Sequence, residues 1–123
     1  MTRQVSYSKI EKEVRPGLRE KLNVAESTED VKKFFVYEVK ELLDKVLEGE
    51  TAVQYEQITL APDEKEGYTL SPSLLHDSRF QKVWENSDLP HIVRRMAEVA
   101  VKRYTHLEKH LDKTEAKIYP RLG

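Results

Sequence analysis

Apolar side chains recur at helical spacing near the start of the chain. They occupy every fourth position and share one helical face, at Ile10, Val14, Leu18 and Leu22. Ser8 and Glu11 have the spacing of a capping box, which predicts the start of a helix. Pro16 and Gly17 interrupt the pattern. Because proline removes a backbone hydrogen bond and clashes with the preceding turn, we expect either a kinked helix or a helix over residues 16–23 that follows a short turn.

Residues 28–48 predict a helix with an unusually broad apolar arc. Ser27 stands at the N-cap, Asp30 follows in the first turn, and Gly49 stands where a C-terminal cap belongs. The apolar positions extend well beyond one seam: Val31, Phe34, Phe35, Val36, Val39, Leu42, Leu43, Val46 and Leu47. A helix of this kind contacts partners on two sides, so it is either the central helix of the domain or a dimer interface. We expect a homodimer, with an interface formed by Phe34, Val36, Leu43 and Leu47.

In residues 51–70 the apolar positions no longer follow helical spacing and recur at every second residue. The stretches "YEQITL" and "GYTL" alternate apolar and polar residues, and the turn-forming "APDEKEG" separates them. This pattern predicts a small β-hairpin, which must lie on helices or pair with a second copy because a lone hairpin is only marginally stable in water.

Two further helices are predicted in the last part of the chain. A short one is capped by Asp77 and carries Phe80, Val83 and Trp84 as an apolar cluster. The final helix is expected over residues 89–116. We expect Asp88 to cap it, with Pro90 tolerated in its first turn and Pro120 ending it. The predicted fold is therefore mainly α: a compact four-helix domain with a small hairpin between the second and third helices.

The length of 123 residues fits a single domain over residues 1–123, in which we expect residues 1–6 to be disordered and residues 117–123 to form a frayed tail. The chain has no cysteine, which excludes disulfides, thiolate metal sites and cysteine nucleophiles. No apolar run approaches the ~18 residues of a membrane span, and the N-terminal residues lack the apolar core of a secretory signal. We expect a cytoplasmic protein that does not contact a membrane.

Several common chemistries lack their motifs in this sequence. The four glycines cannot build a phosphate loop or a dinucleotide fingerprint. The patterns G-x-S-x-G, H-E-x-x-H and Glu-x-x-His are also absent. Glu38 and Glu41 lie one turn apart on the second helix and are interpreted as a surface pair. We therefore expect no cofactor, and the sequence leans against an enzyme without deciding the question.

Charge is distributed unevenly although the net charge is only −1. Residues 26–50 carry eight acidic and four basic side chains, whereas residues 91–123 carry eight basic and four acidic ones. At about 100° per residue, one stripe of the last helix is apolar and the opposite face is basic. That basic face predicts a site for an anionic partner, either an acidic protein or a nucleic acid, formed by Arg95, Lys102, Arg103, Lys109 and Lys113.

His106 and His110 are the candidate metal ligands, because residues four apart lie on one helical face. Both histidines sit among cations, and nearby positive charge disfavours a bound dication. The favoured function is therefore a small non-catalytic binding or regulatory protein that meets an anionic partner through its C-terminal helix. The alternative is a small enzyme or metal-binding protein built around His106 and His110.

Overall fold

The computed structural model describes the backbone of residues 5–122 and the side chains of residues 5–109. The described chain is mainly helical, with five α-helices, one short 3₁₀ helix and a two-stranded hairpin. In chain order the elements are α1 (Ser8–Val24), α2 (Thr28–Leu47), η1 (Tyr55–Gln57), β1 (Ile58–Leu60), β2 (Tyr68–Leu70), α3 (Pro72–Leu75), α4 (Ser78–Glu85) and α5 (Leu89–Leu122). The mainly α prediction and the hairpin between the second helix and the next one are confirmed.

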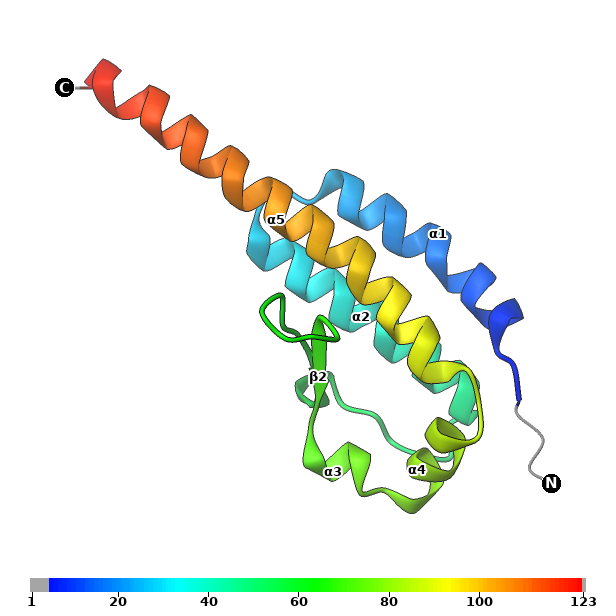
Figure 1. Ribbon diagram of the computed structural model, residues 1–123. Helices are drawn as coiled ribbons and strands as arrows, with labels where there is room; N and C mark the ends of the chain where they lie inside the picture. Colours follow the sequence, from blue (N-terminus) through cyan, green and yellow to red (C-terminus); the bar gives the residue numbers. More distant parts are fainter. Residues whose placement is uncertain (1–4, 123) are drawn as a thin grey trace.

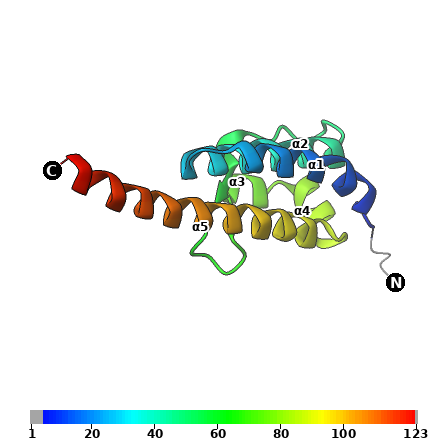
Figure 2. The same ribbon diagram turned by 90° about the horizontal axis from the view of Figure 1, so that it is seen from above.

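Helices α1, α2 and α5 pack lengthwise against one another (Figures 1 and 2). The hairpin, α3 and α4 lie on the side of α2 and α5 that faces away from α1 (Figure 1). The C-terminal part of α5 projects past the ends of the other two long helices. Within the described residues, no helix is both long enough and apolar enough to cross a membrane.

The central helix of the domain is α2. Ser27 caps it, and its side chain accepts a hydrogen bond from the backbone N–H of Asp30 at 3.1 Å, as predicted. Its apolar arc contacts α1 on one side and α5 with strand β1 on the other. The arc is broad because it faces two sets of neighbours within the same chain.

This arrangement corrects half of the predicted dimer interface. Leu43 and Leu47 are fully buried in the chain's own core, so they have no surface to offer a second copy. Phe34 and Val36 are only partly buried against that core. The homodimer stays a prediction, with these two residues as its remaining candidates.

Helix α1 is one continuous helix that includes Pro16, so the predicted alternative of a short turn followed by a helix over residues 16–23 is wrong. The other alternative, a kinked helix, stays a prediction. A Cβ atom placed on Gly17 would lie 2.6 Å from Oε1 of Glu38 on α2. The Glu38 carboxylate therefore occupies the space beside Gly17, and a larger residue at this position would require that carboxylate to shift. The predicted capping box is also wrong. Tyr7 is the N-cap residue, no side chain caps the helix, and Glu11 is directed to α5 instead.

The hairpin pairs antiparallel, with Ile58 opposite Leu70 and Leu60 opposite Tyr68. Ile58 and Leu60 are buried, so the face they share lies on the helices, as the marginal stability of a free hairpin requires. The short helix α3 was not predicted. Its signal is present in the sequence, because Ser71 accepts a hydrogen bond from Leu74 N–H and Pro72 occupies the first turn.

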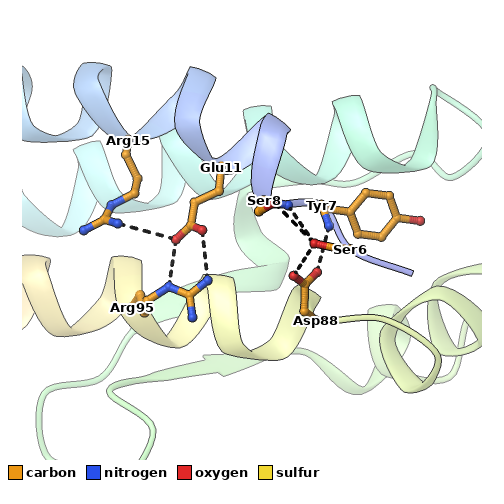
Figure 3. Close-up of polar contacts among 7 residues, drawn as sticks. All are labelled: Ser6, Tyr7, Ser8, Glu11, Arg15, Asp88 and Arg95. Atoms are coloured by element: carbon orange, nitrogen blue, oxygen red, sulfur yellow. Dashed lines mark hydrogen bonds and ion pairs between the residues drawn. The ribbon is translucent and has the colours of Figure 1, made fainter. Parts of the chain in front are cut away.

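Asp88 does not cap α5 with its side chain as predicted. Its carboxylate accepts hydrogen bonds from the backbone N–H of Tyr7 at 2.8 Å and from the hydroxyl of Ser6 at 2.9 Å (Figure 3). The backbone of Val5 also pairs with the turn before α5. Residues 5 and 6, expected to be disordered, are therefore held against the start of α5. Residues 1–4 lie outside the described part of the chain.

Helix α5 starts at Leu89 as predicted, but it ends later than predicted. The sequence placed the end near residue 116, whereas the backbone remains helical through Pro120 to Leu122. Proline removes one backbone hydrogen bond, and two residues continue in helical conformation beyond it.

A bidentate ion pair joins α1 to α5. Nε and Nη2 of Arg95 each donate to a carboxylate oxygen of Glu11 at 2.9 Å (Figure 3). Glu11 is only 5% exposed, and Arg15 lies 3.8 Å away on the same helix. The hydrogen bond to Glu11 also raises the pKa of Arg95. Two parallel N–H···O bonds fix the rotation and register of the two helices.

Replacing Arg95 with alanine is expected to destabilise the fold, because it leaves the buried Glu11 carboxylate without its main partner. Since the Arg95 side chain is itself partly exposed, we expect a loss of about 1–2 kcal/mol rather than the larger loss at a fully buried pair. Urea unfolding of the Arg95→Ala and Arg94→Ala variants measures how much unfolding free energy each substitution removes. Arg94 is the matched control because it lies next along α5 and makes only longer, exposed ion pairs with Glu66 and Glu98. Equal losses in the two variants would contradict the role given to the Glu11 pair.

Candidate anion-binding site

A pocket of about 420 Å³ lies between the C-terminal half of α1 and the middle of α5. Its lining residues are Arg19, Leu22, Asn23, Val99, Lys102, Arg103 and His106. Four of these seven carry basic side chains and none is acidic. In a chain with a net charge of −1, this is a local concentration of positive charge.

The two helices supply the lining at helical spacing. On α1, Arg19, Leu22 and Asn23 are three and four residues apart, so they face the same way. On α5, Val99, Lys102, Arg103 and His106 repeat that spacing. Leu22 is buried and Val99 partly buried, whereas Arg19, Lys102 and His106 are exposed. The pocket therefore combines an apolar part with exposed cationic groups.

Arg103 is held in place by the end of α1. Its Nη2 donates to the carbonyl oxygens of Asn23 at 3.4 Å and Ala25 at 3.2 Å, and Ala25 is the C-cap residue of α1. A cation is favourable at this end of a helix because the carbonyl groups there carry partial negative charge. The Nε atom of Arg103 is buried and has no hydrogen-bond partner. The sequence predicted Arg103 as part of a solvated row, and the structure gives it this additional fixed position.

The remaining cations of the predicted basic face do not form one continuous row. Arg95 is paired with Glu11 on α1. Lys102 lines the pocket, and Lys109 is exposed one to two turns further along α5. The side chain of Lys113 lies outside the described residues. Of the five predicted residues, the structure therefore brings Lys102 and Arg103 together in one site.

Two members of the pocket were not predicted as anion ligands. Arg19 comes from α1, and nothing in the local sequence shows that α1 runs beside residues 99–106. His106 was assigned to a metal site and lines the basic pocket instead. His110, its predicted partner, has a side chain outside the described residues. Among the residues that are described, no group of three or more histidine, aspartate or glutamate side chains could hold a metal ion.

Glu38 is a second departure from the sequence interpretation. It was expected on the surface beside Glu41, yet it is only 3% exposed and packs under Gly17 of α1. Lys21 Nζ lies 3.5 Å from its carboxylate. The signal was available, because Glu38 follows Phe35 by three residues and precedes Leu42 by four, which places it on the apolar stripe.

Burial raises the pKa of Glu38 above its ordinary value, an effect that the nearby Lys21 partly offsets and that Glu41 reinforces. The burial of this carboxylate between α1 and α2 and its ion pair with Lys21 fit a structural role.

Comparisons with protein-family models, with curated proteins and with solved structures gave no match. The function is therefore argued from the residues of the pocket alone.

Glu38 is expected to make stability depend on pH. Because its pKa is higher in the folded than in the unfolded chain, the folded state binds the proton more tightly. Its contribution to stability therefore falls as the pH rises from about 4.3, the ordinary glutamate value, through the raised pKa. Glutamine does not titrate, so Glu38→Gln should gain stability relative to the natural chain across that interval.

Urea unfolding at a series of pH values between 4 and 8 measures the difference between the two proteins. Glu20→Gln is the control, because it removes a carboxylate that is exposed on the same pair of packed helices. A Glu38→Gln difference that does not vary with pH would contradict the assignment.

Proposed function

We propose that this chain is a small non-catalytic binding protein that receives an anionic group of a partner protein in the pocket between α1 and α5. The observation that carries the proposal is the lining of that pocket, in which Arg19, Lys102, Arg103 and His106 converge and none of the described residues is acidic. Such a lining attracts an anion and orients it, because the cations come from two helices whose packing holds them apart.

A protein partner fits this surface better than a nucleic acid does. A nucleic acid presents a regular row of phosphates, and proteins that follow it without base reading use a continuous basic groove. In the part of α5 whose side chains are described, the row is interrupted at its start, because Arg95 pairs with Glu11 and Arg94 pairs with Glu66 and Glu98. One local basic pocket suits a single acidic side chain or a short acidic segment.

The metal-dependent alternative has less support. His106 lies in a pocket with three other basic side chains, and their positive charge opposes a bound dication.

We also propose that the chain forms a homodimer through the partly exposed Phe34 and Val36. We further propose that it acts in the cytoplasm, because its lack of cysteine suits a reducing compartment in which proteins rarely form disulfides.

Reversing the pocket charge is expected to weaken the binding of an acidic polypeptide. The double variant Arg19→Glu with Lys102→Glu replaces two attractive groups by two repulsive ones, so affinity for poly-glutamate should fall by about tenfold or more at low salt. Fluorescence anisotropy of labelled poly-glutamate at two salt concentrations measures it. The natural chain should also lose affinity as salt rises.

The matched control is Lys9→Glu with Lys12→Glu, two exposed lysines in the first half of α1, away from the pocket. These changes alter the net charge by the same amount. If control and pocket variants weaken binding equally, attraction is a property of the net charge and the pocket has no special part in it.

The homodimer is tested by light scattering coupled to size-exclusion chromatography over a range of concentrations. We expect twice the mass of the chain at high concentration, because partly exposed apolar side chains on one helix gain by pairing with a second copy. A single-chain mass at every concentration contradicts the dimer and leaves the pocket proposal unaffected.

A further inference from the structure

We propose that the anionic group for which this pocket is suited is a phosphate monoester rather than a carboxylate. The inference rests on the proposed function and names the chemistry of its ligand. A phosphate monoester can be carried by a phosphorylated side chain of a partner protein or by a small organic phosphate, and both present the same group to the pocket.

The charge of the pocket lining favours a phosphate monoester over a carboxylate. Arg19, Lys102 and Arg103 bring three positive charges to one pocket, and none of the described lining residues carries a negative charge. A carboxylate carries a single negative charge. A phosphate monoester carries about −1.5 to −2 at neutral pH and three strong acceptor oxygens, so it balances more of the lining and can engage all three cations at once.

The two arginines contribute most to this balance. Lys102 also lines a neighbouring hollow that contains Glu64, Glu66 and Glu98. Its positive charge therefore faces these carboxylates as well as the basic pocket. Arg19 and Arg103 do not line that neighbouring hollow. Arg19 also suits phosphate by shape, because the planar fork of an arginine can donate two parallel hydrogen bonds to two phosphate oxygens.

Arg103 is preorganised for that task. Its Nη2 already donates to the carbonyl groups of Asn23 and Ala25, which holds the guanidinium group at the pocket wall. These two bonds leave its Nη1 amino group for a ligand. Because the side chain is ordered before the ligand arrives, less conformational entropy is lost on binding.

The size and apolar part of the pocket indicate an ester rather than the inorganic ion. A volume of about 420 Å³ falls within the usual range of small-ligand sites, roughly 300–1,000 Å³. The partly buried Val99 lines it together with the cations. An organic group attached to the phosphate would cover this apolar side chain, and the bare ion would not.

The test is a titration of the full chain with phenyl phosphate, followed by the NMR shifts of backbone amides in a buffer without phosphate or sulfate. Benzoate and inorganic phosphate are titrated in parallel. We expect saturable shifts at Leu22, Asn23 and Val99, with phenyl phosphate binding about tenfold more tightly than benzoate or inorganic phosphate, which corresponds to about 1.4 kcal/mol.

Variants locate the binding on the pocket. Arg19→Gln should weaken phenyl phosphate by about tenfold, whereas Lys9→Gln, an equal loss of charge on an exposed residue of the same helix, should leave it unchanged. Far-ultraviolet circular dichroism and the unaffected amide shifts show that both variants are folded. A neutral peptide containing one phosphoserine then separates the two sources. Tighter binding of the peptide than of phenyl phosphate assigns the group to a protein partner, and weaker binding assigns it to a small molecule.

The outcomes distinguish this inference from the proposed function. If benzoate binds as tightly as phenyl phosphate, or if phenyl phosphate does not bind while poly-glutamate still binds through Arg19 and Lys102, the phosphate assignment is overturned and the acidic-partner proposal stands. If neither phenyl phosphate nor poly-glutamate depends on these residues, both are overturned.

Discussion

The fold depends on the need to cover the broad apolar arc of α2. Val31, Phe35, Val39, Leu42 and Leu47 are all buried in this one helix, and a helix with apolar residues over so much of its circumference cannot be covered by one neighbour. Helix α1 takes one side, and α5 with the hairpin takes the other. The hairpin is stable only because it lies on this helix layer, since two short strands bury too little surface by themselves.

Once α1 and α5 both lie on α2, a few polar contacts set their relative positions. Glu11 binds Arg95 across the seam, Asp88 holds the backbone ahead of α1, and Arg103 binds the carbonyl groups at its C-terminal end. These contacts occur at both ends of α1. They are directional, whereas apolar packing is not, so they can specify the register in which residues 19–23 face residues 99–106.

The basic pocket follows from that register. The protein as a whole is close to neutral, so its overall field neither attracts nor repels an anion strongly. Among the described residues, α1 and α5 present cations to the same space, and none of the described lining residues there is acidic. At two other cations of α5 the surroundings differ, because Arg94 pairs with Glu66 and Arg95 pairs with Glu11. The positions of acids on the neighbouring segments thus decide which of these cations are paired with a carboxylate.

Much of the local structure could be predicted from the sequence, because it depends on contacts between residues close in the chain. The Ser27 and Asp77 caps, the hairpin and the long amphipathic last helix are all of this kind. The errors concern side chains whose partners are distant. Glu11 and Asp88 have the spacing of helix caps, but a charged or backbone partner from another element binds them in the folded chain. From the sequence alone Leu43 and Leu47 could be interface residues, because the sequence does not show that α2 has neighbours on both sides.

In the candidate site, too, the local structure could be predicted from the sequence, whereas the contacts between distant segments could not. The sequence determined that residues 94–110 form a helix with a basic face, because helical periodicity alone separates that face from the apolar stripe. Only the tertiary structure decided that Arg95 is neutralised by Glu11, that Arg19 joins Lys102 and Arg103, and that these three line one pocket. Spacing along a chain specifies which residues share a face, but the residues that oppose that face are chosen by packing between segments about eighty positions apart.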